Sequence, residues 1–193
     1  YLTVPLQATP GAAPPYDVKF CWVGDLDGDG EYDFVVDRHS TTSSTDHQYL
    51  EGYLRDGTFL WRVDMGPNSV DKYSIEPGSS AISVGAHDNV TVYDMDGDGK
   101  AEVLVRTANG VVLGDGATVT AADETTQFIS MLDGMTGAER SRAPLPNPYL
   151  VDGPLAGHMA IQYCDGRTPS LVFEAENRVG SGVPAWMGCR IPC

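Results

Sequence analysis

The sequence reads DLDGDGEYD at residues 25–33 and DMDGDGKAE at residues 94–102, two near-copies of one acidic turn. Each copy carries carboxylates at positions 1, 3, 5 and 9 and glycines at positions 4 and 6. The residue at position 7 can turn its backbone carbonyl toward the same point. This cage of hard oxygen atoms suits calcium, with water completing about six to eight ligands. We therefore predict one calcium ion in each turn. The alternative is a solvated acidic turn, since Asp and Gly are common turn residues.

The positions in the turn define the predicted ligands. They are Asp25, Asp27, Asp29, Glu31 and Asp33 for one ion and Asp94, Asp96, Asp98, Lys100 and Glu102 for the other, with Glu31 and Lys100 offering backbone carbonyls. An EF-hand loop closes with a bidentate Glu at position 12 and leads into a helix. Position 12 is Val36 in one turn and Val105 in the other. The β-branched and aromatic residues on both sides instead predict that each turn joins two β-strands.

A third, decayed copy of the turn follows at residues 161–169. Asp165–Phe173 aligns with Asp98–Arg106, but Ile161, Tyr163 and Pro169 replace the acidic residues at positions 1, 3 and 9. This copy is therefore predicted to bind no metal.

Asp-Gly turns between hydrophobic segments add a second repeated element. The segment Gly52–Val63 has the pattern of a β-hairpin, and Ile129–Gly137 repeats it more weakly. Four antiparallel strands at a fixed interval are typical of propeller blades. We predict an all-β fold of about three β-propeller-type blades, an incomplete propeller with calcium-binding turns. Residues 1–193 form one β domain: a Pro-rich lead-in at 1–17, repeats at 18–85 and 86–153, and a degenerate third repeat at 154–193.

The order of these motifs resembles the rhamnogalacturonan lyases of polysaccharide lyase family 11. The segments that carry the resemblance are Tyr1–Gln7, Val23–Tyr32, Asp56–Arg62, Gly85–His87 and Tyr93–Glu102. The resemblance implies an eight-bladed β-propeller with several calcium ions, of which this chain would be the N-terminal part. It also implies cleavage of rhamnogalacturonan, a pectic polysaccharide, by β-elimination. Because such a site draws on blades all round the ring, we expect the 193-residue chain alone to be inactive.

Lyases of uronic-acid polymers neutralise the substrate carboxylate and remove the proton at C5. Weak candidates for catalysis are His87, Arg106 and Asn109, and weak candidates for substrate binding are Arg38, His39 and Trp61. Two departures from the family pattern count against activity. Asp37-Arg38 stands where the family tends to have Lys-Trp, and Asn109 stands in place of an acid.

Composition suggests a secreted, extracellular protein. The net charge of −15 argues against a nucleic-acid partner, because a phosphate backbone would be repelled. No segment reaches the ~20 apolar residues of a membrane span. Four cysteines allow a Cys21–Cys164 link, a Cys189–Cys193 link, or free thiols. Asn89 opens a glycosylation sequon, and it is either modified or a buried, unmodified side chain.

Two other functions fit the same sequence. One is a noncatalytic module that binds glycans. The other is a structural or adhesive subunit that assembles into a homo-oligomer or filament, because open sheet edges recruit strands from other chains.

Overall fold

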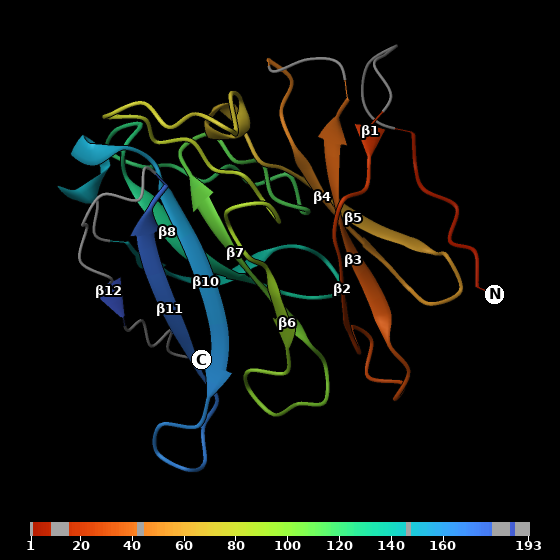
Figure 1. Cartoon of the computed structure of the whole chain (residues 1–193). Helices are drawn as coiled ribbons and strands as arrows, with labels where there is room; N and C mark the ends of the chain where they lie inside the picture. The colour runs from red at the N-terminus through yellow and green to blue at the C-terminus, as the bar shows by residue number, and fades with distance from the viewer. Residues whose placement is uncertain (1, 9–15, 42–44, 146–147, 179–185, 188–193) are drawn as a thin grey trace.

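The computed structural model describes residues 2–8, 16–41, 45–145, 148–178 and 186–187. Within these residues the chain forms three antiparallel sheets, one after another along the sequence (Figure 1). Helical structure in the described part is limited to two short 3-10 segments, η1 (Pro67–Ser69) and η2 (Pro148–Asp152). The predicted all-β class and antiparallel pairing are therefore confirmed.

The strands fall into three sheets. The first sheet contains β1 (Tyr16–Asp17), β2 (Cys21–Gly24), β3 (Asp33–Ser40), β4 (Tyr49–Tyr53) and β5 (Phe59–Asp64). The second contains β6 (Thr91–Tyr93), β7 (Glu102–Ala108), β8 (Gln127–Leu132) and β9 (Glu139–Pro144). The third contains β10 (Leu155–Gln162), β11 (Ser170–Asn177) and β12 (Trp186–Met187).

Each acidic turn joins two neighbouring strands of one sheet, as predicted. The residue pairs next to the turns are Gly24–Asp33 in the first sheet and Tyr93–Glu102 in the second. The decayed third copy joins β10 to β11 in the same way. The first two sheets also share a register shift in their last hairpin, between Gly52 and Tyr53 and between Met131 and Leu132. The two sheets are therefore structural copies of one unit.

Neighbouring sheets pack through the strands that lead into the turns, with β6 lying against both β2 and β10. A Cβ atom at Gly24 would lie 2.4 Å from Cγ1 of Val92, so this contact between β2 and β6 requires glycine. One buried cluster, which includes Val35, Val63 and Val105, fills the space between the first two sheets. A second cluster, which includes Leu104 and Phe173, joins the second sheet to the third. Full burial of a side chain of this size contributes about 1.5–3 kcal/mol.

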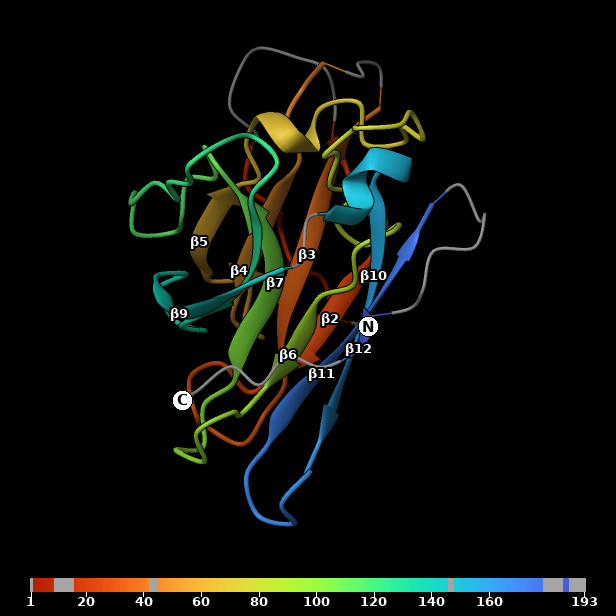
Figure 2. The ribbon, with the colours of Figure 1, turned by 90° about the vertical axis from the view of Figure 1, so that its left-hand side faces the viewer.

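The sheets lie side by side and do not close into a ring within the described residues (Figures 1 and 2). The turns at residues 25–33, 94–102 and 161–169, here called the first, second and third turns, lie at one end of the sheets, the turn end. The long connection at residues 65–90 runs over the other end, the loop end.

Two other predictions can be compared with the structure. Of the alternatives left open for the cysteines, the Cys21–Cys164 link is excluded, because both thiols are free and exposed. Cys189 and Cys193 lie outside the described residues, as does the lead-in at 9–15. Residues 2–8 lie against the first sheet of their own chain, where the Arg38 side chain donates to Gln7 O at 3.1 Å. No helix in the described part is long and apolar enough to cross a membrane.

Candidate metal centre

The first turn is stabilised by hydrogen bonds from its backbone N–H groups to its own carboxylates. Asp25 accepts hydrogen bonds from Gly28 N at 2.7 Å and from Gly30 N at 2.8 Å. Glu31 N donates to Asp29 Oδ1 at 2.8 Å. Both glycines have positive φ, 85° and 90°, a conformation that other residues rarely adopt. The tight turn brings carboxylate oxygens of Asp25, Asp27 and Asp29 within 4.8 Å of one another.

The second turn repeats this geometry. Asp94 accepts from Gly97 N at 2.6 Å and from Gly99 N at 3.0 Å, and Lys100 N donates to Asp98 Oδ1 at 2.8 Å. Here the oxygens within 4.8 Å of one another come from Asp94, Asp96 and Glu102. The two turns therefore fold alike at nearly every hydrogen bond, although the oxygen clusters differ in their third member.

The carboxylates at position 9 also support the backbone. Asp33 Oδ2 accepts from Leu26 N, and Glu102 Oε2 accepts from Met95 N, both at 2.8 Å. Asp33 Oδ1 in addition accepts from Arg55 N at 2.8 Å. Burial raises the pKa of both carboxyl groups above the usual range, with the backbone N–H donors opposing that shift. In this structure position 9 ties the two ends of each turn together.

Positive side chains reach the turns from the neighbouring hairpins. Arg140 of β9 forms ion pairs with Asp96, at 2.7 Å, and with Glu102. Arg55 pairs with Glu31 at 2.8 Å, but both side chains are more than half exposed. The arginine that pairs with the second turn is therefore less exposed to solvent than the arginine that pairs with the first turn.

The donor set of both turns fits calcium. All the clustered donors are carboxylate oxygens, the ligand type that calcium prefers, and they include no nitrogen or sulfur donor. A cation would also offset the repulsion between the clustered carboxylates. The residues available to hold it are Asp25, Asp27 and Asp29 in the first turn and Asp94, Asp96 and Glu102 in the second. Asp33, Asp98 and the carbonyls of Glu31 and Lys100 lie outside these clusters and stay predicted ligands.

The first two turns are joined to each other. Ala101 N donates to Asp25 O at 2.7 Å. A Cβ atom at Gly134 would lie 2.0 Å from Ala101 O, so the hairpin between β8 and β9 closes over the same junction. The third turn meets the second through the hydroxyl groups of Tyr93 and Tyr163, which are 2.8 Å apart.

The catalytic candidates lie away from the acidic turns. Arg106 is fully buried and pairs with Asp88 at 2.8 Å, and burial lowers its pKa to about 10. Asn109 is half-buried and donates to Glu124 Oε1 at 3.1 Å. His87 is half-buried beside Tyr73, and burial followed by the charge of Arg178 lowers its pKa.

The substrate-binding candidates are buried. Arg38 pairs with Glu51 at 2.7 Å. His39 Nε2 lies 2.6 Å from Asp37 Oδ2 and 3.1 Å from Val84 O. Trp61 is 2 % exposed and donates to Gly134 O at 2.7 Å. These contacts occupy the three side chains inside the protein and leave almost no surface for a sugar.

Sequence comparison identifies the family. Residues 1–139 match the model of "Rhamnogalacturonan lyase family 11, C-terminal domain". The chain belongs to rhamnogalacturonan lyase family 11. It is 31% identical to rhamnogalacturonan endolyase YesW of Bacillus subtilis (strain 168) over 90% of its length. It is 36% identical to rhamnogalacturonan exolyase YesX of the same organism over 89% of its length.

Solved structures of this lyase family share the fold. The crystal structure of YesW matches 90% of the chain with a TM-score of 0.70 and 28% identity. That of the exotype lyase YesX matches 96% with a TM-score of 0.71 and 25% identity. The Bacillus licheniformis rhamnogalacturonan lyase PL11 matches 97% with a TM-score of 0.70 and 27% identity. The chain spans about a third of each of these proteins, 33%, 36% and 38% respectively.

The family assignment corrects one detail of the prediction and adds residues that it missed. The matched model describes the C-terminal domain of the lyase family, so the predicted N-terminal placement is not supported. Arg140 was missed as a residue of the second turn because it lies 38 positions beyond Glu102. The sequence signal that could have found Arg140 is its position directly after the weaker Asp-Gly hairpin, on a strand next to the second turn.

Proposed function

We propose that this chain is a calcium-binding part of an extracellular rhamnogalacturonan lyase. It supplies about three blades of a β-propeller, and it cleaves rhamnogalacturonan by β-elimination only when the remaining blades complete the ring. The observation that carries this proposal is the pair of matched acidic turns, folded alike in adjacent sheets of a chain from this family. The coverage of about a third of each solved relative supports the need for further blades.

Calcium bound in each turn supplies a fixed positive charge that holds the carboxylates together. The residues of the chain provide the frame. Asp25 and Asp94 orient the backbone N–H groups of the turns, and Asp33 and Glu102 tie the turn ends together. This frame aligns β2 and β6, the strands that lead into the two turns, and such strands face the centre of the ring in a propeller.

Among the three catalytic candidates, His87 has the chemistry of a base. Its lowered pKa keeps the imidazole neutral at pH 7, and a neutral ring can accept a proton. Asn109 carries an amide, which does not act as a base. Arg106 is enclosed by Asp88, Ala81 O and Leu155 O, so it positions the loop end and does not reach a substrate.

Lyase assays on the isolated chain test the proposal that the chain alone does not cleave rhamnogalacturonan. The chain is incubated with rhamnogalacturonan and millimolar calcium, and unsaturated products are followed by ultraviolet absorbance. We expect no rise in absorbance. Full activity of the chain, together with a monomeric mass by light scattering, would show that the missing blades are not needed.

A chimera tests the proposal that the chain becomes active when the remaining blades are present. The chain replaces the corresponding third of YesW, and activity on rhamnogalacturonan is measured with and without His87→Ala. We expect the chimera to cleave the polymer and His87→Ala to lower kcat by about 10²-fold or more. His158→Ala is the matched control, because His158 is an exposed histidine on β10. A folded chimera without activity, or equal rates in both variants, would contradict the assignment. Self-assembly through sheet edges stays a prediction, which the same light scattering measures.

A further inference from the structure

Two open cavities lie next to each other across the turn end. One, of about 270 Å³, lies between the first and second turns and is lined by Val23, Asp25 and Tyr32. The other, of about 360 Å³, lies between the second and third turns and is lined by Tyr163 and Arg167. Tyr93 and Asp94 line both cavities. Because they share these two residues, the cavities adjoin, and together they are here called the turn groove.

Tyrosines from all three sheets line the turn groove. Tyr32 is 63% exposed, Tyr93 is 37% exposed and Tyr163 is 47% exposed. Val23, at 48%, adds apolar surface between the first two turns. The hydroxyl groups of Tyr93 and Tyr163 bond to each other, and the exposed surface of the three rings is left for a ligand. Exposed apolar surface gathered in a hollow with a polar rim marks a binding site.

The polar atoms of the turn groove define its ligand. Asp25, Asp94 and Asp96 belong to the acidic turns, so the hydroxyl groups of the tyrosines and of Thr168 are the groups that can bond to the hydroxyl groups of a ligand. Arg140 already pairs with Asp96, so Arg167 is the cationic residue that lines the cavity between the second and third turns. Even with one calcium ion in each turn, the net charge of the chain would be −15 + 4 = −11, which repels an anionic ligand. Flat tyrosine faces beside hydroxyl acceptors suit a chain of neutral sugars, which have apolar ring faces and hydroxyl edges.

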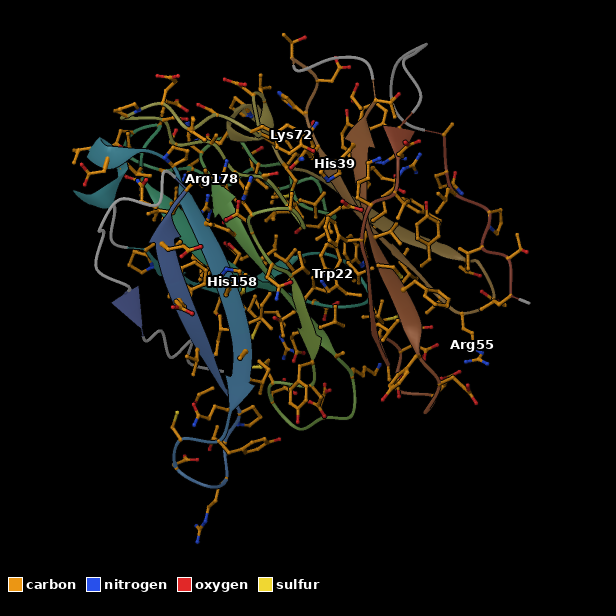
Figure 3. All side chains as sticks on the ribbon, viewed as in Figure 1. Trp22, His39, Arg55, Lys72, His158 and Arg178 are labelled. Atoms are coloured by element: carbon orange, nitrogen blue, oxygen red, sulfur yellow. The ribbon has the colours of Figure 1, made fainter. Side chains whose placement is uncertain are left out.

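We propose that the turn groove binds a neutral oligosaccharide across Tyr32, Tyr93 and Tyr163. The groove lies at the opposite end of the sheets from Lys72, His39 and Arg178, which Figure 3 shows near the loop end. It therefore goes beyond the proposed lyase reaction, whose substrate is acidic. Binding there would hold the protein on neutral regions of a plant polysaccharide.

Calorimetric titration of the full chain in millimolar calcium tests this proposal. Cellotetraose and galactotetraose are the neutral probes, and tetragalacturonate is the acidic probe. We expect a neutral probe to bind, Tyr93→Ala and Tyr163→Ala each to weaken that binding about tenfold, and Tyr93→Phe to retain it. Tyr73→Ala is the matched control, since Tyr73 is 60% exposed but lies in the connection at the loop end.

Several outcomes would overturn the proposal. They are no binding of either neutral probe, equal affinity in the alanine variants, loss of binding in Tyr73→Ala, or tighter binding of tetragalacturonate. Thermal melting and calcium stoichiometry show whether each variant folds. If an alanine variant does not fold, hydrogen exchange on the unmodified chain replaces it. The bound neutral sugar should then protect residues 91–94 and 163–168, and protection confined to residues 70–90 would refute the turn groove.

Discussion

At the scale of single residues, the acidic side chains of the turns have different tasks. The carboxylates at position 1 organise the turn backbone, and those at position 9 are buried against the strands. Asp27 and Asp29 make fewer such bonds and lie nearer to solvent. They are therefore the residues whose charge can be removed with least damage to the metal-free fold.

Replacing Asp27→Asn together with Asp29→Asn should remove calcium from the first turn. Both changes keep the side-chain size and delete two negative charges, so they isolate electrostatics from packing. We expect calcium stoichiometry to fall from two ions to one. At calcium about a hundredfold above Kd, the loss should cost about 2.7 kcal/mol in the free energy of unfolding. Asp165→Asn, in the third turn, is the control and should change neither value. Two ions in the double variant would show that the ligands are wrongly assigned.

His87 should make the stability of the chain fall in mild acid. Burial lowers its pKa in the folded state below the ordinary value of 6.5. The unfolded chain therefore binds the proton more tightly, and the stabilisation present above about pH 6.5 is lost as pH falls toward the folded-state pKa. Thermal melting from pH 7.5 to 5 in excess calcium measures this slope. His87→Gln should flatten it, while His158→Gln should not. Equal slopes in all three proteins would rule out this role of His87.

At the scale of strands and turns, the repeats were predictable from the sequence because their signals are local. The spacing of Asp and Gly fixes a turn, and the alternation around it fixes two strands. Contacts between distant segments were not predictable in this way. Trp61 looked like a sugar-binding ring, yet it donates to Gly134 O, 73 residues away. Arg106 looked like a catalytic cation, yet it is buried against Asp88. A local sequence pattern does not show which distant residues a side chain will contact in the folded protein.

The two turns should differ in calcium affinity because of Arg140. This side chain neutralises Asp96 and Glu102, so a cation entering the second turn must compete with it. We expect Arg140→Gln to strengthen calcium binding at that turn by about two- to tenfold. The variant should also lower the thermal stability of the metal-free chain. Arg142→Gln, on the same strand but paired with Glu139, is the matched control. Weaker calcium binding in Arg140→Gln would mean that the arginine supports the bound ion.

At the scale of the whole molecule, the three sheets are held by two kinds of interaction. The first two sheets are joined by a buried apolar cluster and, in addition, at their acidic turns, where carboxylates crowd together. The third sheet is held by an apolar cluster and by Arg178 of the residues after β11, which pairs with Asp88 at 3.1 Å and donates to Lys72 O at 2.7 Å. Apart from Met95, a residue of the second turn that belongs to this apolar cluster, these contacts lie outside the acidic turns. Calcium should therefore stabilise the sheets unequally.

Chelation of calcium should loosen the first two hairpins more than the third. Without the cation, like charges crowd the turns at residues 25–33 and 94–102, while the third turn keeps only Asp165 at the equivalent positions. We expect a lower melting temperature in excess chelator. Hydrogen exchange should accelerate in β2–β3 and β6–β7 and stay nearly constant in β10–β11. Magnesium in place of calcium is the control for ionic strength, because magnesium keeps its water ligands and favours a smaller octahedral site. Exchange that rises equally in all three hairpins would mean that the sheets open as one cooperative unit. Exchange and melting unchanged by the chelator would remove the basis for calcium in either turn.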